Sequence, residues 1–88
     1  MVGFEIGRIV FSKCGRDKGL PFVVLKVEGE FVYLADGKLR NVNNPKKKKM
    51  KHVQITKTVN SYINAALCNN TILLDSDLRK AVNEFAKV

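Results

Sequence analysis

Five short runs of β-type residues, each bounded by turn residues, are the feature that most constrains the fold of this chain. They are GRIVFSK, PFVVLKV, FVYLA, KLRNV and KHVQITK, and they lie between residues 7 and 57. Short runs rich in valine, isoleucine, phenylalanine and tyrosine are typical of strands, and several at close spacing favour a small closed or nearly closed barrel. The sequence therefore predicts a mainly β fold for this part of the chain.

Turn residues separate the predicted strands. The loop CGRDKG lies between the first two runs, and its Gly15 and Gly19 are expected to take backbone angles that other residues avoid. Asp36 and Gly37 separate the third run from the fourth. This pair favours a hairpin with a type I′ turn, which needs positive φ at both central residues. We therefore expect all four residues to be structural.

Period-two alternation predicts which strand residues face the core, because successive side chains on a strand point to opposite faces. The natural inward pairs are Val23 with Leu25 and Val32 with Leu34. The remaining residues of the third strand, among them its two aromatic rings, then share the other face.

The last thirty residues change to a helical period. The first apolar stripe has the spacing i, i+3, i+4, i+7 and i+8 and consists of Val59, Tyr62, Ile63, Ala66 and Leu67. Asn69 and Asn70 can end this helix. A second stripe follows Asp75 and Ser76, either of which can cap a helix, and it consists of Leu78, Ala81, Val82 and Phe85. We predict a barrel over residues 1–57 with a helical hairpin, residues 58–88, packed on it in a single compact domain.

The net charge of +8 is confined to the first two thirds of the chain. Residues 1–57 hold 13 lysines and arginines against 5 acidic residues, whereas residues 58–88 hold 3 against 3. A basic patch of this kind is typical of proteins that bind nucleic acids or anionic surfaces. Its densest part is PKKKKMKH, residues 45–52, which we interpret as a loop that joins the fourth and fifth strands and grips phosphates. A merely solvated stretch is the alternative.

Features of a membrane or exported protein are not found in the sequence. The longest apolar stretch is the five residues FVYLA, whereas about 20 are needed to span a bilayer. The N-terminal segment contains Glu5 and has no basic leader followed by an apolar block. We therefore expect a cytoplasmic protein that has no membrane partner.

The sequence offers little for metal binding or catalysis. Cys14 and Cys68 lie 54 residues apart, and His52 is the single histidine, so we expect free thiols, no metal and no cofactor. The sequence contains no phosphate-binding glycine motif and no Cys/His pair that could act as a nucleophile and its base. Glu28 and Glu30 flank a turn, where charged residues are ordinarily solvated. We expect no enzymatic activity.

The stretch GRIVFSKCGRDKGLPFVVLKVEGEFVYLADGKLR resembles a KOW motif, in which a glycine-bearing loop lies between two apolar strands. The continuation NPKKKKMKHVQ extends the match, and both together resemble the bacterial KOW-domain RNA-binding proteins that are related to archaeal and eukaryotic large-subunit ribosomal proteins. The resemblance covers about residues 7–56 and departs at Cys14, where a small residue such as alanine is expected. It implies an SH3-like barrel that binds RNA, with ribosomal RNA and the large ribosomal subunit as expected partners.

The candidate RNA-binding residues fall into three groups. The lysine run and its neighbouring histidine contribute Lys46, Lys47, Lys48, Lys49, Lys51 and His52. The glycine loop contributes Lys13, Arg16 and Lys18, and Arg40 follows the Asp-Gly turn. Lysine meets phosphate as a mobile point charge, whereas the planar guanidinium of arginine can stack on a base or form a fork with phosphate.

Each group also has a plainer interpretation. The charges of the glycine loop can simply keep a tight turn soluble, Arg40 can pair with Asp36, and His52 can be an ordinary strand residue. Phe31 and Tyr33 can form a stacking platform for bases, but we favour core packing beneath the helices. The function predicted overall is non-catalytic RNA binding, with a protein-interaction adaptor as the alternative, because SH3-like barrels also bind peptides.

Overall fold

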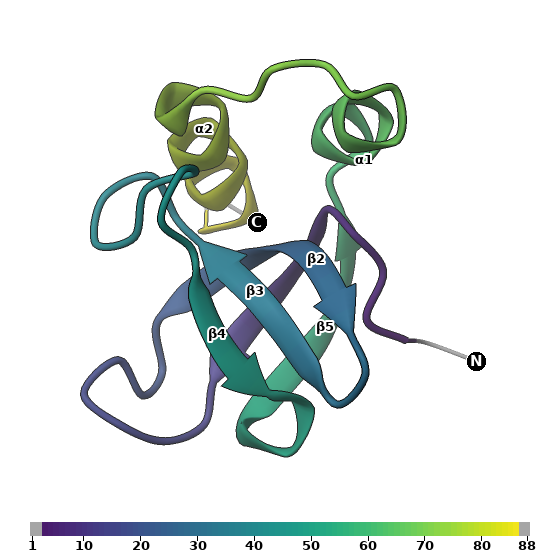
Figure 1. Ribbon diagram of the computed structural model, residues 1–88. Coiled ribbons are helices and arrows are strands. Elements are labelled where there is room, and N and C mark those ends of the chain that lie inside the picture. Colours follow the sequence, from purple (N-terminus) through teal and green to yellow (C-terminus); the bar gives the residue numbers. More distant parts are fainter. Residues whose placement is uncertain (1–2, 87–88) are drawn as a thin grey trace.

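Five antiparallel strands and two helices make up the computed structural model, which describes residues 3–86 (Figure 1). The strands are β1 (Arg8–Ser12), β2 (Pro21–Glu28), β3 (Phe31–Ala35), β4 (Lys46–Lys49) and β5 (Val53–Val59). A short 3-10 helix, Met50–His52, joins the last two strands, and the helices α1 (Ser61–Cys68) and α2 (Asp75–Ala86) follow. The prediction of a mainly β fold with two C-terminal helices is confirmed.

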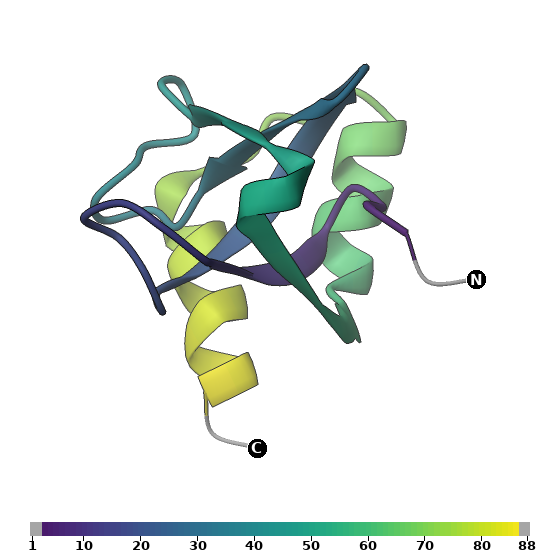
Figure 2. The same cartoon turned by 90° about the horizontal axis from the view of Figure 1, so that it is seen from below.

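The strands form one sheet in the order β4-β3-β2-β1-β5, so β4 and β5 are its edges. Only three residues, Met50–His52, carry the chain from one edge to the other (Figure 2). The Met50 N–H donates to the carbonyl of Glu30, and the carbonyl of His52 accepts from the Lys13 N–H. Such a short crossing requires a strongly curled sheet. The described strands do not close it by hydrogen bonds between β4 and β5, so the sheet is open.

The fourth strand is not where the sequence predicted it. KLRNV, residues 38–42, is a loop, and the lysine run that was predicted to be a loop is β4. The carboxylate of Asp36 accepts hydrogen bonds from the N–H groups of Lys38 and Arg40, both at 3.0 Å, so this segment satisfies its backbone groups locally. Of the Asp-Gly pair, only Gly37 has positive φ (+81°), so the turn is not of type I′.

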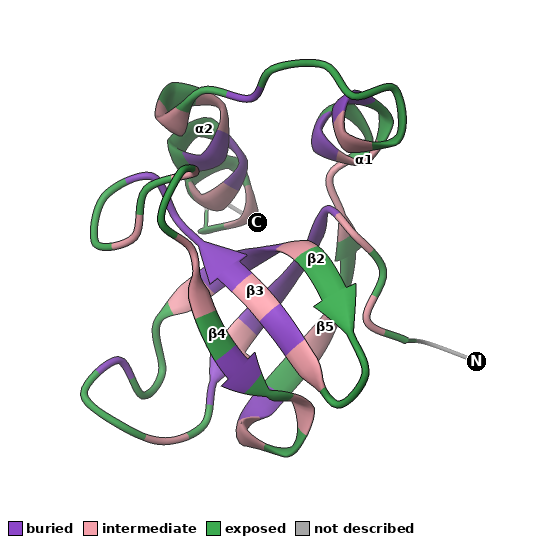
Figure 3. Cartoon of the chain, viewed as in Figure 1, coloured by how far each residue is buried: buried purple, intermediate pink, exposed green. Residues whose placement is uncertain are grey.

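Two apolar clusters lie on opposite faces of the curled sheet. The inner cluster is formed by Val10, Phe22, Val24, Val32, Leu34 and Val53. The outer cluster joins the sheet to both helices and is formed by Ile9, Val23, Ala35, Ile63, Ala66, Leu73, Leu78 and Ala81. Figures 1 and 3 show both helices over the same side of the sheet. Strand β2 is therefore buried on both faces near its start, as happens where helices cover a sheet.

This two-sided burial corrects one detail of the predicted core. Val32 and Leu34 point inward as expected, and β3 shows the alternation clearly (Figure 3). Val23, however, belongs to the outer cluster, and Leu25 packs against that cluster only partly buried. The two predicted pairs thus lie on opposite faces of the sheet, because the helices supply a second apolar surface that strand alternation alone does not reveal.

Both helices form where their stripes predicted them, but Val59, the first residue of the first stripe, ends β5 and is not helical. Asn60 caps α1 by accepting a hydrogen bond from the Ile63 N–H at 2.9 Å, and the helix ends at Cys68, just before the predicted Asn-Asn pair. Tyr62 was predicted on the buried face but is exposed. In α2 the cap is not the side chain of Asp75 or Ser76. Instead, the carboxylate of Asp77 accepts from the Leu74 N–H at 3.0 Å, as the third helical residue does in a capping box.

Candidate nucleic-acid interface

Asp17 connects the glycine loop to the lysine strand. Its Oδ1 accepts from the hydroxyl of Ser12 at 2.7 Å and from Nζ of Lys48 at 3.0 Å, and its Oδ2 accepts from Nζ of Lys46 at 2.8 Å. Burial raises the pKa of Asp17, but the hydrogen bonds from Lys46, Ser12 and Lys48 together outweigh burial and hold that pKa well below its usual range. The carboxylate therefore stays ionised at neutral pH and fixes the loop against β4.

Lys48 has a structural role in this network. Its side chain is 8% exposed, and its ammonium donates to the hydroxyl of Ser12, to the carbonyl of Cys14 at 2.7 Å and to Asp17. An ammonium has three donors, and all three have acceptors within the protein. We therefore move Lys48 from the candidate phosphate contacts to the structural residues. Lys46 is in an intermediate position, because it pairs with Asp17 but keeps 30% of its side chain exposed.

The alternate lysines of β4 point the other way. Lys47 lies opposite Tyr33, and Lys49 lies opposite Phe31, in the register of β3 and β4. Nζ of Lys47 is 4.5 Å from the ring centroid of Phe31 and 6.0 Å from that of Tyr33. From β2, Nζ of Lys26 lies 5.3 Å from the Tyr33 ring. We call these five residues the basic–aromatic face.

The two rings are half-buried and belong to neither apolar cluster. The expectation that Phe31 and Tyr33 pack in the core beneath the helices is therefore wrong. The helices cover the end of β3 at Ala35, as Figure 1 shows. Tyr33 and Phe31 precede Ala35 by two and four residues, so they lie about 7 and 13 Å away from it along the strand. The same face of β3 thus continues beyond its helical cover and meets solvent.

Lys26 was not among the contacts predicted from the sequence, although the predicted inward pair of Val23 and Leu25 would leave it on the outer face. In the structure Val24 pairs with Leu34 on the inner face, and without a bulge Lys26 would also turn inward. The register shifts between Val24 and Lys26, and Lys26 then lies opposite Tyr33 on the outer face. A bulge adds one residue to one strand and so reverses the side of every residue beyond it. The lysine itself, which is costly to bury unpaired, was the available signal.

Glu28 adds a negative charge beside the basic–aromatic face. It lies opposite Phe31, and its Oε2 is 3.3 Å from Nζ of Lys26. The hydrogen bond and the charge of Lys26 lower the pKa of Glu28 from its usual value. The carboxylate is therefore ionised at neutral pH and balances Lys26, so the unbalanced positive charge of this face lies on the β4 side.

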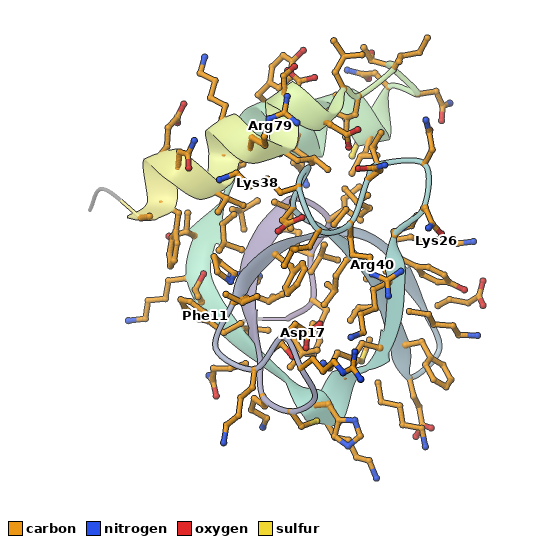
Figure 4. The ribbon with its side chains drawn as sticks, turned by 90° about the vertical axis from the view of Figure 1, so that its left-hand side faces the viewer. Phe11, Asp17, Lys26, Lys38, Arg40 and Arg79 are labelled. Carbon is orange, nitrogen blue, oxygen red and sulfur yellow. The ribbon has the colours of Figure 1, made fainter. Side chains whose placement is uncertain are left out.

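Arg16 and Arg40 meet at a second basic surface. With Lys46, they line a shallow recess of about 350 Å³ whose remaining lining residues are Asp17, Leu20, Phe22 and Leu39. Figure 4 shows Arg40 and Asp17 in this region. The carboxylate of Asp36 accepts from backbone N–H groups and does not pair with the guanidinium of Arg40 within the described residues. The suggested Arg40–Asp36 ion pair is therefore wrong.

The other predicted residues surround these two surfaces. Lys13 and Lys18 are exposed in the glycine loop, where Gly15 and Gly19 have φ of +90° and +85°. Lys51 is exposed in the 3-10 helix and, with Lys49, lines a recess of about 290 Å³. His52, in the same helix, is half-buried. Predicted contacts that were scattered along the sequence thus gather around β4 and the glycine loop.

The His, Cys, Asp and Glu side chains of residues 3–86 form no group of three that could hold a metal ion. In the same residues, neither helix is both long and apolar enough to cross a membrane.

Comparison of the chain with protein-family models and with curated protein sequences gave no match. The KOW resemblance therefore stays a prediction, and the candidate site is defined by its own geometry.

Proposed function

We propose that this protein is a non-catalytic RNA-binding protein that uses the basic–aromatic face and the neighbouring arginine recess. The observation that carries the proposal is the position of Lys47 and Lys49 on a paired strand beside two half-exposed aromatic rings. RNA binding needs cations for phosphates and flat surfaces for exposed bases, and this face offers both. Because strand pairing fixes the backbone that carries these lysines, a bound RNA loses less affinity to the ordering of the protein.

The fold supports the same proposal. A strongly curled five-stranded antiparallel sheet with a 3-10 helix before its last strand is compatible with an SH3-like barrel, the fold that the KOW resemblance implies. On this proposal ribosomal RNA and the large ribosomal subunit are the expected partners, and the protein acts in the cytoplasm. Seven cations that are not engaged with Asp17 remain as proposed phosphate contacts: Lys13, Arg16, Lys18, Arg40, Lys47, Lys49 and Lys51.

A salt titration tests RNA binding directly. If about five phosphates are neutralised, the logarithm of the association constant should fall by about 3 to 4 for each tenfold rise in salt, because bound cations release counterions. We expect Lys47→Gln/Lys49→Gln to weaken binding of any RNA sequence and to reduce this slope. Lys57→Gln/Lys80→Gln removes the same charge from exposed positions on β5 and α2 and serves as the control. Equal effects of the two variants would refute the assignment of the β4 lysines.

Sedimentation tests the ribosomal partner separately. Tagged protein in host lysate would be run on sucrose gradients at low and high salt, with a parallel sample treated with RNase. Migration with the large ribosomal subunit at moderate salt supports the proposed partner. Migration at the top of every gradient refutes the ribosomal partner. Binding to RNA outside the ribosome is then tested by the salt titration alone.

A protein-interaction adaptor is the second candidate, and one observation favours it. Tyr62 in α1 and Ile72 and Leu74 between the two helices are 58%, 82% and 59% exposed. Large exposed apolar residues can serve protein binding where they form a contiguous patch. The ultraviolet absorbance of protein purified without nuclease distinguishes the two candidates. Absorbance from bound nucleic acid that high salt removes favours RNA binding, and no such absorbance favours the adaptor.

A further inference from the structure

We propose that the basic–aromatic face recognises single-stranded RNA, with unpaired bases stacked on Phe31 and Tyr33 and with the phosphates held along β4. This inference rests on the proposed RNA-binding function and deepens it by naming the class of RNA. It follows from three observations: the spacing of the two rings, the weak cover over them, and the distribution of charge around them.

The two rings offer separate surfaces at a fixed spacing. Phe31 and Tyr33 are alternate residues of β3, so their side chains emerge on the same face about 7 Å apart. Strand pairing with β2 and β4 on both sides fixes their positions. Aromatic residues on the surface of a sheet are known to stack two or three RNA bases. Each ring here can therefore accept one base.

The cover over the rings is easily displaced. Lys47 lies 4.5 Å from the centroid of Phe31 and 6.0 Å from that of Tyr33, Lys26 lies 5.3 Å from that of Tyr33, and both lysines are solvent-exposed. An exposed cation–π contact is weaker than the stacking of a base on an aromatic ring. A base therefore replaces the Lys47 ammonium, and the flexible lysine stem lets that ammonium swing to a neighbouring phosphate.

The charges give the bound strand a direction across the face. Lys26 pairs with Glu28 on the β2 side, whereas Lys47 and Lys49 on the β4 side form no ion pair among the described residues, although the charge of Lys47 also acts on Glu28. Phosphates are repelled by Glu28 and attracted by the two lysines. The backbone of the RNA thus lies over β4, and the edges of the bases point towards β2.

The same arrangement disfavours a duplex. In double-stranded RNA the base faces are stacked within the helix, and proteins reach mainly phosphates and 2′-hydroxyls. The lysines of β4 can meet duplex phosphates, but Phe31 and Tyr33 would then face the backbone and gain no stacking. The rings therefore add affinity only for unpaired nucleotides.

The test compares one short unstructured RNA with the duplex that contains it, in fluorescence anisotropy titrations over a range of salt concentrations. We expect the wild type to bind the single strand more tightly. Phe31→Leu/Tyr33→Leu should weaken single-strand binding at least about tenfold, since each stacked base contributes substantially. The dependence of that binding on salt should not change, and duplex binding should also be unchanged. Tyr62→Leu removes an exposed aromatic ring from α1 and should have no effect, and circular dichroism confirms that each variant is folded.

A spectroscopic measurement reports stacking directly. The chain has two tyrosines and no tryptophan, so in Tyr62→Phe the fluorescence at tyrosine wavelengths comes from Tyr33 alone. After correction for absorption by RNA, single-stranded RNA should quench this fluorescence, and duplex at equal occupancy should not.

The outcomes separate the two proposals. Equal affinity for single strand and duplex, or an unaffected Phe31→Leu/Tyr33→Leu variant, overturns the single-strand inference while RNA binding stands. Failure of the wild type to bind either RNA at low salt overturns the proposed function itself, and the inference with it.

Discussion

The carboxylate of Asp17 lies 3.0 Å from the ammonium of Lys48, although 31 residues separate the two in the chain. Asp17 belongs to the glycine loop, and Lys48 belongs to an edge strand, so this ion pair fastens one to the other. A buried ammonium needs a hydrogen-bonded partner, which explains why the third lysine of the run turns inward. The lysine run is thus half structural and half exposed.

The first prediction is that neighbouring lysines of β4 affect different properties. Lys48→Gln should lower the free energy of unfolding by about 1 to 3 kcal/mol, because buried acceptors lose a charged donor. Lys47→Gln should lower it by less than about 1 kcal/mol, the size of an exposed cation–π contact. It should instead weaken RNA binding and reduce the salt slope by about 0.7. Urea denaturation and RNA titration measure the two effects. An undiminished stability of Lys48→Gln would contradict its buried role.

The second prediction concerns acid stability. Because the folded-state pKa of Asp17 is depressed, its contribution to stability is complete above the unfolded pKa of about 3.9 and is lost as the pH falls below that value. Asp17→Asn should therefore be less stable than the wild type at pH 7, and the gap should narrow on acidification below about pH 4. Urea unfolding between neutral and acidic pH measures this gap. A gap that is constant with pH would show that Asp17 is not held ionised by its partners.

The third prediction is a gain of affinity on the proposed interface. Glu28→Gln removes the negative charge beside Phe31 and frees Lys26, whose ammonium is 3.3 Å from the carboxylate. We expect RNA to bind about two- to fivefold more tightly at low salt, with a steeper salt dependence as one more cation reaches phosphate. Glu84→Gln, at an exposed position on α2, makes the same charge change elsewhere. A similar gain in both variants would indicate only a general effect of net charge.

The fourth prediction compares two glycines that both have positive φ. At Gly37 (φ +81°) an added Cβ would collide with the backbone carbonyl of Asp75 in α2, whereas at Gly19 (φ +85°) it would meet nothing within 4 Å. Gly19→Ala should cost about 1 to 2 kcal/mol, the strain of the left-handed backbone. Gly37→Ala should cost at least about 2 kcal/mol more, because overpacking is added to strain. Thermal and urea unfolding measure both variants, and equal losses would contradict the close approach of the turn to α2.

The order of the elements was largely predictable, because it follows from local patterns. The segments that became β1, β2, β3 and β5 were recognised from their β-branched and aromatic residues, and both helices were recognised from their apolar stripes. The candidate site was predicted less well. The lysine run was identified as important from its charge, but the sequence could not show that Lys48 points inward or that Lys26 and the rings of β3 join Lys47 on one surface.

Most of the elements and the location of the positive charge follow from local sequence, since side-chain periodicity and composition are properties of neighbouring residues. The strand of four lysines arises from the fold instead, because backbone pairing with β3 overrides their low strand propensity. The folded structure also determines which lysines are free, through an aspartate far away in the sequence, and it lets Val24 point inward while Lys26 joins the rings of β3, through a bulge. These outcomes depend on contacts between distant segments, and no local pattern encodes them.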